Sequence, residues 1–517
     1  MGTKMEWIKK SKEYVKESVE TVSAACIRLT KKEFMRRYGI TEVEEKANQY
    51  HLDISGKEPF AICPVFFEKK ENSINICSVC FALLILSKGV EELEFITQEE
   101  EKNNTELINC LINTIVLSVQ KKSDSSDMYW PTSISTASIV ESGTCNQTTV
   151  ALSALLRVGF FDMNSEIDKD VIISRYGIAV NALSWLINIQ QNNAWTYGEN
   201  CKTIGGDPIT YSVLSSHFCY ETLKKYIEHF NSEKGSNEIV SIINSKILDR
   251  IHSSCKAFEE WAESKLKETN GVTKTNASHS HSILHTCLCF IIYCFDNKKL
   301  HTNILEDGLR YVLDNLDELE FTEEELLEAY NYTYETSDGR SDSKTDTYEI
   351  IPEYLFINFS TRLMKGYYST SLTSSQKNKL KKANYIAYKK LFDKTTTFKF
   401  HGKDEHLVLQ GVQLAEGKRF PIYGLYDLQL CLLELLNSSK GKNSISIIRK
   451  PINPILIRIV LIVLGIAAMA ILLYVALKLD FNNTATGLLL AIMGPIGGAV
   501  GTLIVTSYKD IIKFFKG

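Results

Sequence analysis

The sequence predicts an all-helical protein that ends in two transmembrane helices. Only nine prolines occur in the 517 residues, and proline is the residue that helix interiors exclude. Apolar residues recur at helical spacing, as in the stretch 179–190, whereas strand-like alternation is sparse. Near the end of the chain, two long runs carry no charged residue, as a bilayer-spanning helix requires.

Charge and composition narrow the function classes. Lys and Arg number 58 against 62 Asp and Glu, so the chain is not generally basic and no nucleic-acid partner is expected. Hydrophobic residues make up 44% and charged residues 23%, which excludes a disordered chain. The 13 cysteines are scattered and odd in number. We expect them to be free thiols in a chain that faces the cytosol.

The chain divides into five parts. Residues 1–40 form an N-terminal helical segment that lacks the apolar run of a signal peptide. Residues 41–437 form a large helical domain, 438–453 a linker, 454–508 a transmembrane hairpin and 509–517 a basic cytoplasmic tail. Within the large domain we expect a solvated helix over Asp314–Glu328 and a flexible loop over Glu335–Thr347.

A pattern returns six times within residues 41–437. In each copy an aromatic or proline-containing loop leads into a helix start rich in Ser, Thr or Asn, and then into an apolar helix. The copies are Pro59–Gly89, Met128–Gly159, Trp195–Tyr226, Asn276–Phe295, Asp346–Gly366 and Arg419–Leu436. Their irregular spacing is longer than that of common solenoid repeats and fits one helix pair with its loops per copy.

One copy resembles a known repeat family. The segment WLINIQQNNAWTYGE, residues 185–199, resembles the glutamine–tryptophan repeat of squalene and hopene cyclases and related prenyltransferase-like proteins. The resemblance implies that Gln190 or Gln191 caps a turn and that Trp195 packs on the next helix pair. The segment departs from the family pattern at Asn193, where the family has glycine, and in a shorter spacing between Gln and Trp.

The same resemblance suggests the architecture of the whole domain. The stretch Thr148–Gly159 is similar to the inner helices of these repeats. The resemblance therefore implies an all-α, (α/α) toroid-like helical repeat domain, in which inner helices surround a central cavity. Two transmembrane helices follow it. A HEAT-like helical solenoid is the alternative for the repeat domain.

The residues with which such cyclases perform catalysis are absent. The resemblance would imply a D-x-D-D or D-D-x-x-D motif, but no two aspartates are adjacent in this chain. Prenyltransferases of similar shape bind zinc, and His281 and His285 lie four residues apart, as zinc-binding pairs do. Spacing supplies no third ligand, so core or capping histidines are favoured over a metal site. We expect no catalytic residue and no cofactor.

Aromatic side chains are the best candidates for ligand contacts. They gather in the loops that enter the repeats: Trp130, Trp195, Tyr197, Tyr211, Tyr423 and Tyr426. In a toroid such loops border one mouth of the cavity, where aromatic rings suit an apolar or nucleobase-bearing ligand. Packing between helix pairs is the alternative role. Asp207, which follows two glycines before a helix start, is a further candidate contact or an N-cap.

The two apolar runs near the end predict a membrane hairpin. Ile459–Leu477 has 19 residues without a charge and no polar face, and residues 481–508 are also uncharged. Most basic residues flank the two outer ends, and only Lys478 lies in the connection. The positive-inside rule therefore places both termini in the cytoplasm and the protein in the inner or plasma membrane, with the lipid bilayer as a partner.

Small residues mark the second span. Gly494, Gly497, Gly498 and Gly501 are spaced so that helix backbones can approach closely, within the hairpin or between copies in a homo-oligomer. Packing within the hairpin is favoured over a pore-lining role. Pro495 is expected to kink the span because it leaves a carbonyl without its partner.

Two functions of different classes fit this layout. The first is a membrane-anchored, noncatalytic sensor or effector, whose cytosolic toroid binds a small-molecule or protein ligand and acts through the hairpin. By architectural analogy alone, a bacterial effector that disrupts the membrane during phage defence has this layout. The second is a terpenoid-cyclase-like or prenyltransferase-like enzyme that acts on an isoprenoid lipid at the membrane.

Overall fold

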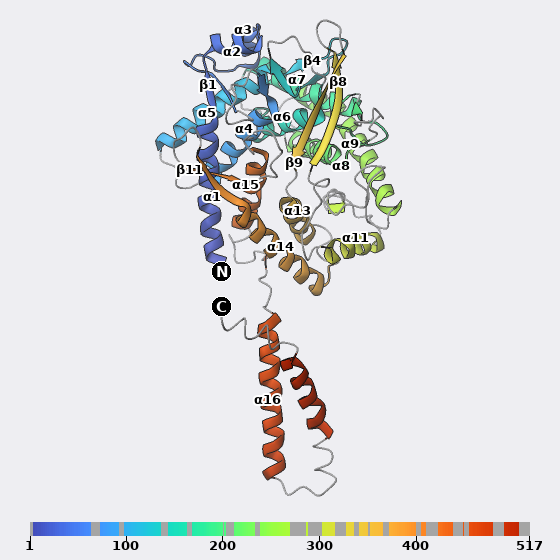
Figure 1. Ribbon diagram of the computed structural model, residues 1–517. Coiled ribbons are helices and arrows are strands. Elements are labelled where there is room, and N and C mark those ends of the chain that lie inside the picture. The colour runs from blue at the N-terminus through green and yellow to red at the C-terminus, as the bar shows by residue number, and fades with distance from the viewer. Residues whose placement is uncertain are drawn as a thin grey trace. The chain divides into compact units, whose positions relative to one another are not determined.

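The computed structural model divides the chain into two compact units, Met1–Ile448 (unit 1) and Arg449–Gly517 (unit 2). It describes residues 4–63, 73–92, 98–135, 143–162, 168–199, 201–202, 211–232, 238–268, 286–287, 302–315, 327–335, 341–349, 352–365, 372–399, 405–409, 422–437, 448, 454–478 and 491–505. The described part of both units is mostly helical (Figure 1).

Five apolar helices of unit 1 lie where the repeats predict them, and we call these the inner helices. They are α4 (Ile76–Glu92), α6 (Cys145–Arg157), α8 (Val213–Ser232), α13 (Pro352–Lys365) and α15 (Ile422–Asn437). The first of them is buried on every side from Ile76 to Leu86. The fourth repeat, Asn276–Phe295, lies outside the described residues except for Thr286 and Cys287.

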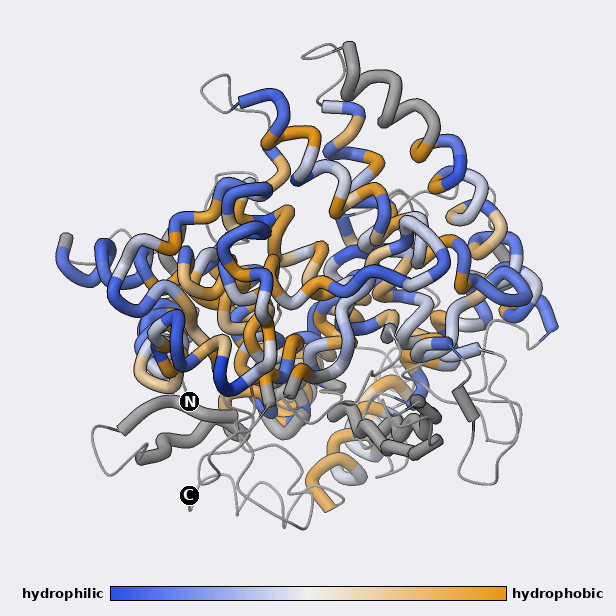
Figure 2. The backbone as a smooth tube through the Cα atoms, turned by 90° about the horizontal axis from the view of Figure 1, so that it is seen from above, coloured by the Kyte–Doolittle hydropathy of each residue, from blue (hydrophilic) through white to orange (hydrophobic). Residues whose placement is uncertain are grey.

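A second set of helices covers the inner ones, and we call these the outer helices. They are α1 (Lys4–Ala25), α5 (Gln98–Leu117), α7 (Lys169–Asn188), α9 (Glu238–Glu268) and α14 (Ser374–Lys394), and a further amphipathic helix is α11 (Thr302–Asp314). Each of these helices buries its apolar face and exposes its polar face, because only the burial of apolar surface is favourable. Figure 2 shows hydrophilic stretches mostly at the outside of unit 1.

The inner helices form a closed series, in which the ion pair between Glu221 of α8 and Arg362 of α13 joins two helices that are not packed on each other over a long stretch. Helix α4 packs on α6, α6 on α8, α13 on α15, and α15 on both α4 and α1. Gln429 of α15 makes the closing contact, because its Nε2 donates to Ser18 Oγ at 3.2 Å and to the Ile85 carbonyl at 3.0 Å. The last inner helix thus meets the first, as in a toroid, whereas an open solenoid keeps its ends apart.

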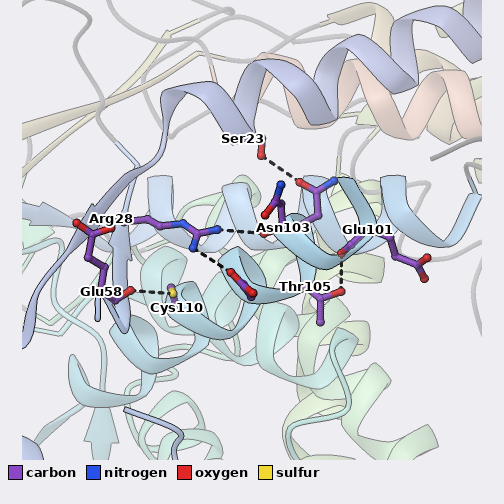
Figure 3. Close-up of polar contacts among 9 residues, drawn as sticks. Ser23, Arg28, Glu58, Glu101, Asn103, Thr105 and Cys110 are labelled. Carbon is purple, nitrogen blue, oxygen red and sulfur yellow. Dashed lines mark hydrogen bonds and ion pairs between the residues drawn. The ribbon is translucent and has the colours of Figure 1, made fainter. Parts of the chain in front are cut away.

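The N-terminal helix belongs to this unit. Arg28, just after α1, donates from Nη2 to the Asn103 carbonyl at 3.1 Å and pairs with Glu106 at 3.4 Å (Figure 3). One turn earlier, Ser23 Oγ donates to Asn104 Oδ1 at 3.0 Å. These contacts join the end of α1 to α5 and fix the edge of the ring where the chain begins.

Short strands and two short helices connect the larger helices. The helices are α2 (Lys31–Tyr38) and α3 (Val43–Tyr50), and the antiparallel pairs are β1 (Ile27–Leu29) with β2 (Phe60–Ile62), β3 (Ser73–Asn75) with β6 (Ser133–Ser135), β4 (Gln120–Lys121) with β5 (Met128–Tyr129), and β10 (Thr395–Lys399) with β11 (Glu405–Leu409). The pairing of β3 with β6 joins the segment that enters α4 to one that precedes α6 in the chain.

One expectation within the helical domain is wrong. Most of Glu335–Thr347 is not a loop, because β8 (Leu327–Glu335) and β9 (Ser341–Glu349) form a nine-residue antiparallel ladder, and β7 (Cys201–Lys202) pairs with β8. The missed signal is the alternation of Tyr330, Tyr332 and Tyr334, which is the two-residue period of a strand. The fold is therefore mostly helical rather than purely so.

Unit 2 contains two described helices, α16 (Pro454–Lys478) and the helix Ala491–Val505. Two helices of the described chain are long and apolar enough to cross a membrane, α16 and α7. Half of the tested stretch of α7 is buried, as expected of an outer helix packed on unit 1, whereas none of that of α16 is buried. The second predicted span is described as helical only over Ala491–Val505, which is shorter than a bilayer requires.

The two helices of unit 2 pack against each other at glycines. A Cβ on Gly465 would lie 2.2 Å from Val500, and one on Gly497 would lie 3.5 Å from Met469. The helix Ala491–Val505 continues through Pro495. A Cβ on any of the remaining predicted packing glycines would meet nothing within 4 Å: Gly494, Gly498 and Gly501. Only Gly497 of the predicted set therefore faces α16.

Candidate functional site

Three of the predicted aromatic residues lie in the core at the starts of the inner helices. Trp130 and Trp195 are fully buried and donate their indole N–H groups to the carbonyls of Ile115 and Leu186, both at 2.8 Å. Tyr197 is also fully buried, and its hydroxyl accepts from Gln147 at 3.1 Å. This placement fits the alternative role in packing, and the role of these residues in ligand binding stays a prediction.

Side-chain contacts of Gln190 and Trp195 hold the turn between α7 and α8. Gln190 Nε2 donates to the carbonyls of Asn193 and Ser254, each at 3.2 Å, and its Oε1 accepts from Ser254 Oγ at 2.7 Å. Trp195 packs edge-on against Phe258 of α9, with ring centroids 5.5 Å apart. Asn193 adopts φ 66°, the left-handed conformation that glycine or asparagine tolerates best.

The other predicted contacts are placed only in part. The half-buried Tyr211 packs edge-on against Trp261, with ring centroids 5.0 Å apart. Tyr423 belongs to α15, but its side chain lies outside the described residues, as do Asp207, His281 and His285. No group of three His, Cys, Asp or Glu that could hold a metal ion occurs among the residues that the structure describes.

Tyr426 is the predicted residue around which charged groups from several inner helices meet. Its ring lies 5.2 Å from that of Phe81 of α4, and Lys88 Nζ lies over it at 5.5 Å. Burial raises the pKa of Tyr426, as do the charges of Asp427 and Glu221, while the charge of Arg157 opposes the rise. These groups are therefore within electrostatic reach of one another, although they come from α4, α6, α8 and α15.

Helix α13 joins the same place through an ion pair. Arg362 donates from Nη1 to Glu221 Oε1 at 2.5 Å and from Nη2 to Oε2 at 3.4 Å. We call Glu221, Arg362, Tyr426 and Asp427 the interior cluster. Burial alone would raise the pKa of Glu221, but the charges of Arg362, His217 and Lys225 and the Arg362 hydrogen bond outweigh it and lower the pKa to about 2. Glu221 is therefore ionised at neutral pH.

Asp427 has the opposite electrostatic environment. Burial among the helices raises the pKa of its carboxyl group to about 8. The residue nevertheless keeps part of its surface accessible, as do Tyr354 and Tyr426. At pH 7 Asp427 is mostly neutral, so it can donate a hydrogen bond as well as accept one. Displaced pKa values of this kind concentrate at functional sites.

The cluster also contains an unused hydrogen-bonding group. His217 lies one turn before Glu221 on the same face of α8 and is 6% exposed, and its Nδ1 has no hydrogen-bond partner. Burial lowers the pKa of His217 to about 4, with Arg362 and Lys225 lowering it further against the effect of Glu221. The imidazole is therefore neutral at pH 7, and its buried ring nitrogen is available to a ligand.

Sequence reasoning found Tyr426 but missed its neighbours. The sequence offers little signal for them, because Glu221, Arg362 and Asp427 share their helices with other charged residues. The structure does not group Tyr426 with the other predicted aromatics. Arg157, which acts on Tyr426, is twelve residues after Cys145 at the start of α6, or about 18 Å along the helix axis, whereas Trp130 and Tyr197 contact that start.

The fold and the cluster define a mostly helical protein with ionisable groups inside a ring of helices. No family model matches the chain, and no curated protein matches it. Among solved structures it is similar to a reducing-end-xylose releasing exo-oligoxylanase, with 9% identity over 78% of this chain and 93% of that chain and a TM-score of 0.38. A mutant of that name complexed with xylobiose gives 9% identity, coverage of 77% and 92%, and a TM-score of 0.37. At these values the likeness carries no argument about activity.

Proposed function

We propose that the protein is a membrane-anchored, noncatalytic sensor or effector. In this proposal unit 1 faces the cytosol and binds a ligand inside its ring of helices, and unit 2 anchors the protein and responds to that ligand. A bacterial effector that disrupts the membrane in phage defence is the most specific form of this proposal. That form depends on architecture alone.

The distribution of exposed apolar side chains carries the proposal. Apart from Ile27, every exposed large apolar side chain among the described residues lies in unit 2: Val460, Leu461, Val463, Leu464, Ile466, Ile471, Leu473, Tyr474, Ile492, Ile504 and Val505. An exposed apolar surface of this kind is unfavourable in water but is compatible with the hydrocarbon core of a bilayer. Unit 1 buries its apolar residues in the manner of a water-soluble protein.

The interior cluster supports a polar ligand over an isoprenoid one. An isoprenoid ligand would place hydrocarbon against the Glu221–Arg362 ion pair, both side chains of which keep part of their surface accessible to water. Removing charged groups from water without full pairing is costly. The alternative enzyme that acts on an isoprenoid lipid is therefore the weaker hypothesis.

Charged substitutions in α16 test the anchor. Leu464 and Ile471 are 60% and 63% exposed, and lysine near the centre of a span costs about 3 kcal/mol per residue. We expect the double variant Leu464→Lys, Ile471→Lys to leave the membrane fraction and the wild type to float with lipid vesicles. Ile27→Lys, at an exposed apolar position of unit 1, is the matched control and should float like the wild type.

Growth of the expressing cells tests the effector role. We expect the full chain to slow growth when its ligand is present, and a chain that ends near Lys440 to leave growth unchanged. Equal toxicity from the two chains would reject an effector that acts through the hairpin. Flotation of the double lysine variant with vesicles would reject the anchor itself.

A further inference from the structure

We propose that one face of helix α14 is a docking surface for the anionic lipid headgroups of the membrane that holds unit 2. The face consists of Lys379, Lys382 and Lys389, and we call it the lysine face. The inference rests on the proposed function, because it assumes that unit 2 lies in a bilayer. It adds a contact between unit 1 and the bilayer surface, and it names the lipid class that this contact requires.

Helix α14 carries a strong excess of positive charge. It has seven lysines and one acidic residue, Asp393, although the whole chain has a net charge of −4. Other outer helices place Glu four residues from Lys, as in the pairs Lys16–Glu20 of α1 and Lys256–Glu260 of α9. In α14 only Asp393 is available for such a pair, so it could offset one of these charges at most.

Three of the lysines form one exposed face. Lys379, Lys382 and Lys389 are all exposed, and their spacing of three and seven residues places them on the same side of the helix. The half-buried Ile386 belongs to that side, whereas Ala387 is buried on the other. Among the residues that the structure describes, no carboxylate pairs with any of the three lysines. The lysine face is therefore open to an anionic partner.

Helix α14 lies beside the last described helix of unit 1. Tyr388 of α14 donates its hydroxyl group to the Cys431 carbonyl at 3.0 Å, so α14 contacts the second half of α15, which ends at Asn437. Figure 1 shows α14 at one end of unit 1, and α2 and α3 at the other. The helix that carries the lysine face is therefore next to the one from which the chain continues towards unit 2.

A short tether keeps unit 1 close to the bilayer. Ile448 packs against the core of unit 1 and α16 begins at Pro454, so the six steps from 448 to 454 join the two units. An extended chain spans at most about 3.6 Å per residue, or roughly 20 Å over this tether. With unit 2 in the bilayer, part of the surface of unit 1 must then lie near the lipid headgroups.

An anionic bilayer surface is the partner that fits this charge. The sequence 438–458 carries five cations and no carboxylate: Lys440, Lys442, Arg449, Lys450 and Arg458. A basic cluster beside a membrane span attracts anionic lipids. The same lipids would attract the lysine face once it lies within a Debye length of them, roughly 10 Å. Ile386 suits this position, because apolar side chains of a basic interfacial helix enter the headgroup region.

Labelling of lysines in the full chain, reconstituted in lipid nanodiscs, tests the inference. The discs contain phosphatidylcholine with or without phosphatidylserine, and a water-soluble succinimidyl ester labels exposed amines for mass spectrometry. We expect phosphatidylserine to reduce the labelling of Lys382 about threefold or more, and salt at about 1 M to restore it. Lys256 of α9, whose side chain is 77% exposed, is the internal control and should be labelled equally in both discs.

Paired charge reversals separate the lysine face from the overall charge of the protein. Lys379→Glu with Lys389→Glu should abolish the protection of Lys382 by phosphatidylserine. Lys121→Glu with Lys256→Glu changes the net charge equally at exposed positions elsewhere in unit 1 and should preserve that protection. All four replaced lysines are exposed, so the melting temperatures should stay near that of the wild type.

The outcomes distinguish this inference from the proposed function. Equal labelling of Lys382 in both kinds of disc, or protection that survives Lys379→Glu with Lys389→Glu, would overturn the docking surface and point to a soluble acidic partner instead. Entry of the chain into discs of phosphatidylcholine alone reads out the anchor. A chain that does not enter them contradicts the anchor, and labelling in the presence of phosphatidylserine vesicles then still tests the lysine face.

Discussion

Arg362 of α13 holds Glu221 of α8 through both terminal nitrogens of its guanidinium group, across 141 residues of sequence. Both side chains are mostly buried, at 25% and 15% exposure. The pair links two inner helices whose intervening chain is described only in part. It therefore contributes to ring closure as well as to the electrostatics of the interior.

Breaking this pair should destabilise unit 1. Arg362→Met leaves the ionised Glu221 without its main partner, and we expect a loss of about 3 kcal/mol in the free energy of unfolding. Adding Glu221→Gln should restore part of it. Denaturant unfolding measures both variants. The exposed pair Lys256–Glu260 is the control, and Lys256→Met should cost less than about 1 kcal/mol. An equal loss at both sites would contradict the role of Arg362.

Asp427 should make the protein less stable as the pH rises. Its pKa is about 8 in the folded protein and well below that in the unfolded chain, so the unfolded state loses its proton first. The loss of free energy of unfolding that Asp427 causes grows from about pH 4 to pH 8, by at most about 1.4 kcal/mol per pH unit. Above that range the loss is constant. Asp427→Asn should remove this slope, as melting curves at several pH values would show.

The titratable groups near Asp427 should not contribute to this pH dependence. Tyr354 of α13, together with Tyr426 and Cys431 of α15, responds to its charge, and burial raises the pKa of each of the three. They stay neutral through the range in which Asp427 titrates, so they add no slope there. A wild-type stability that does not fall between pH 5 and 8 relative to Asp427→Asn would contradict the assigned pKa.

Gln190 should contribute more to the stability of the fold than Gln191 does. Gln190→Ala removes two hydrogen bonds to Ser254 of α9 and one to the Asn193 carbonyl within the turn, and we expect a loss of about 2 kcal/mol in the free energy of unfolding. Gln191 is exposed, so Gln191→Ala should cost less than about 0.5 kcal/mol. Thermal unfolding of the two variants provides the comparison. Similar losses would remove the turn-capping role from Gln190.

Packing between the two helices of unit 2 should require glycine at position 465 but not at position 494. A Cβ at Gly465 collides with Val500, whereas one at Gly494 meets nothing within 4 Å. Cysteines placed at positions 469 and 497 report the packing, because Met469 Sδ lies 3.5 Å from the Cβ position of Gly497. We expect Gly465→Val to lower the yield of this disulfide, mapped by mass spectrometry, and Gly494→Val to preserve it. The reverse order would place the helix contact on the other face.

The helices, their repeats and the apolar hairpin were predictable because each depends on local pattern. Apolar spacing in a helix records which face is buried, whatever the partner is. The same is true of the uncharged run in α16. The ladder of β8 and β9 was missed although the tyrosines of β8 alternate, because the partner strand β9 is almost entirely polar and has no apolar pattern of its own.

The interior cluster was decided only by tertiary structure. Its members Glu221, Arg362, Tyr426 and Asp427 come from three helices, and the neighbouring Lys88 and Arg157 come from two more. Nothing in the spacing of these residues along the sequence distinguishes them from the other charged residues of the same helices. Ring closure through Gln429 brings α15 back to α4 and places these charges within reach of one another. Electrostatic coupling depends on distance in space, which sequence spacing between different helices does not contain.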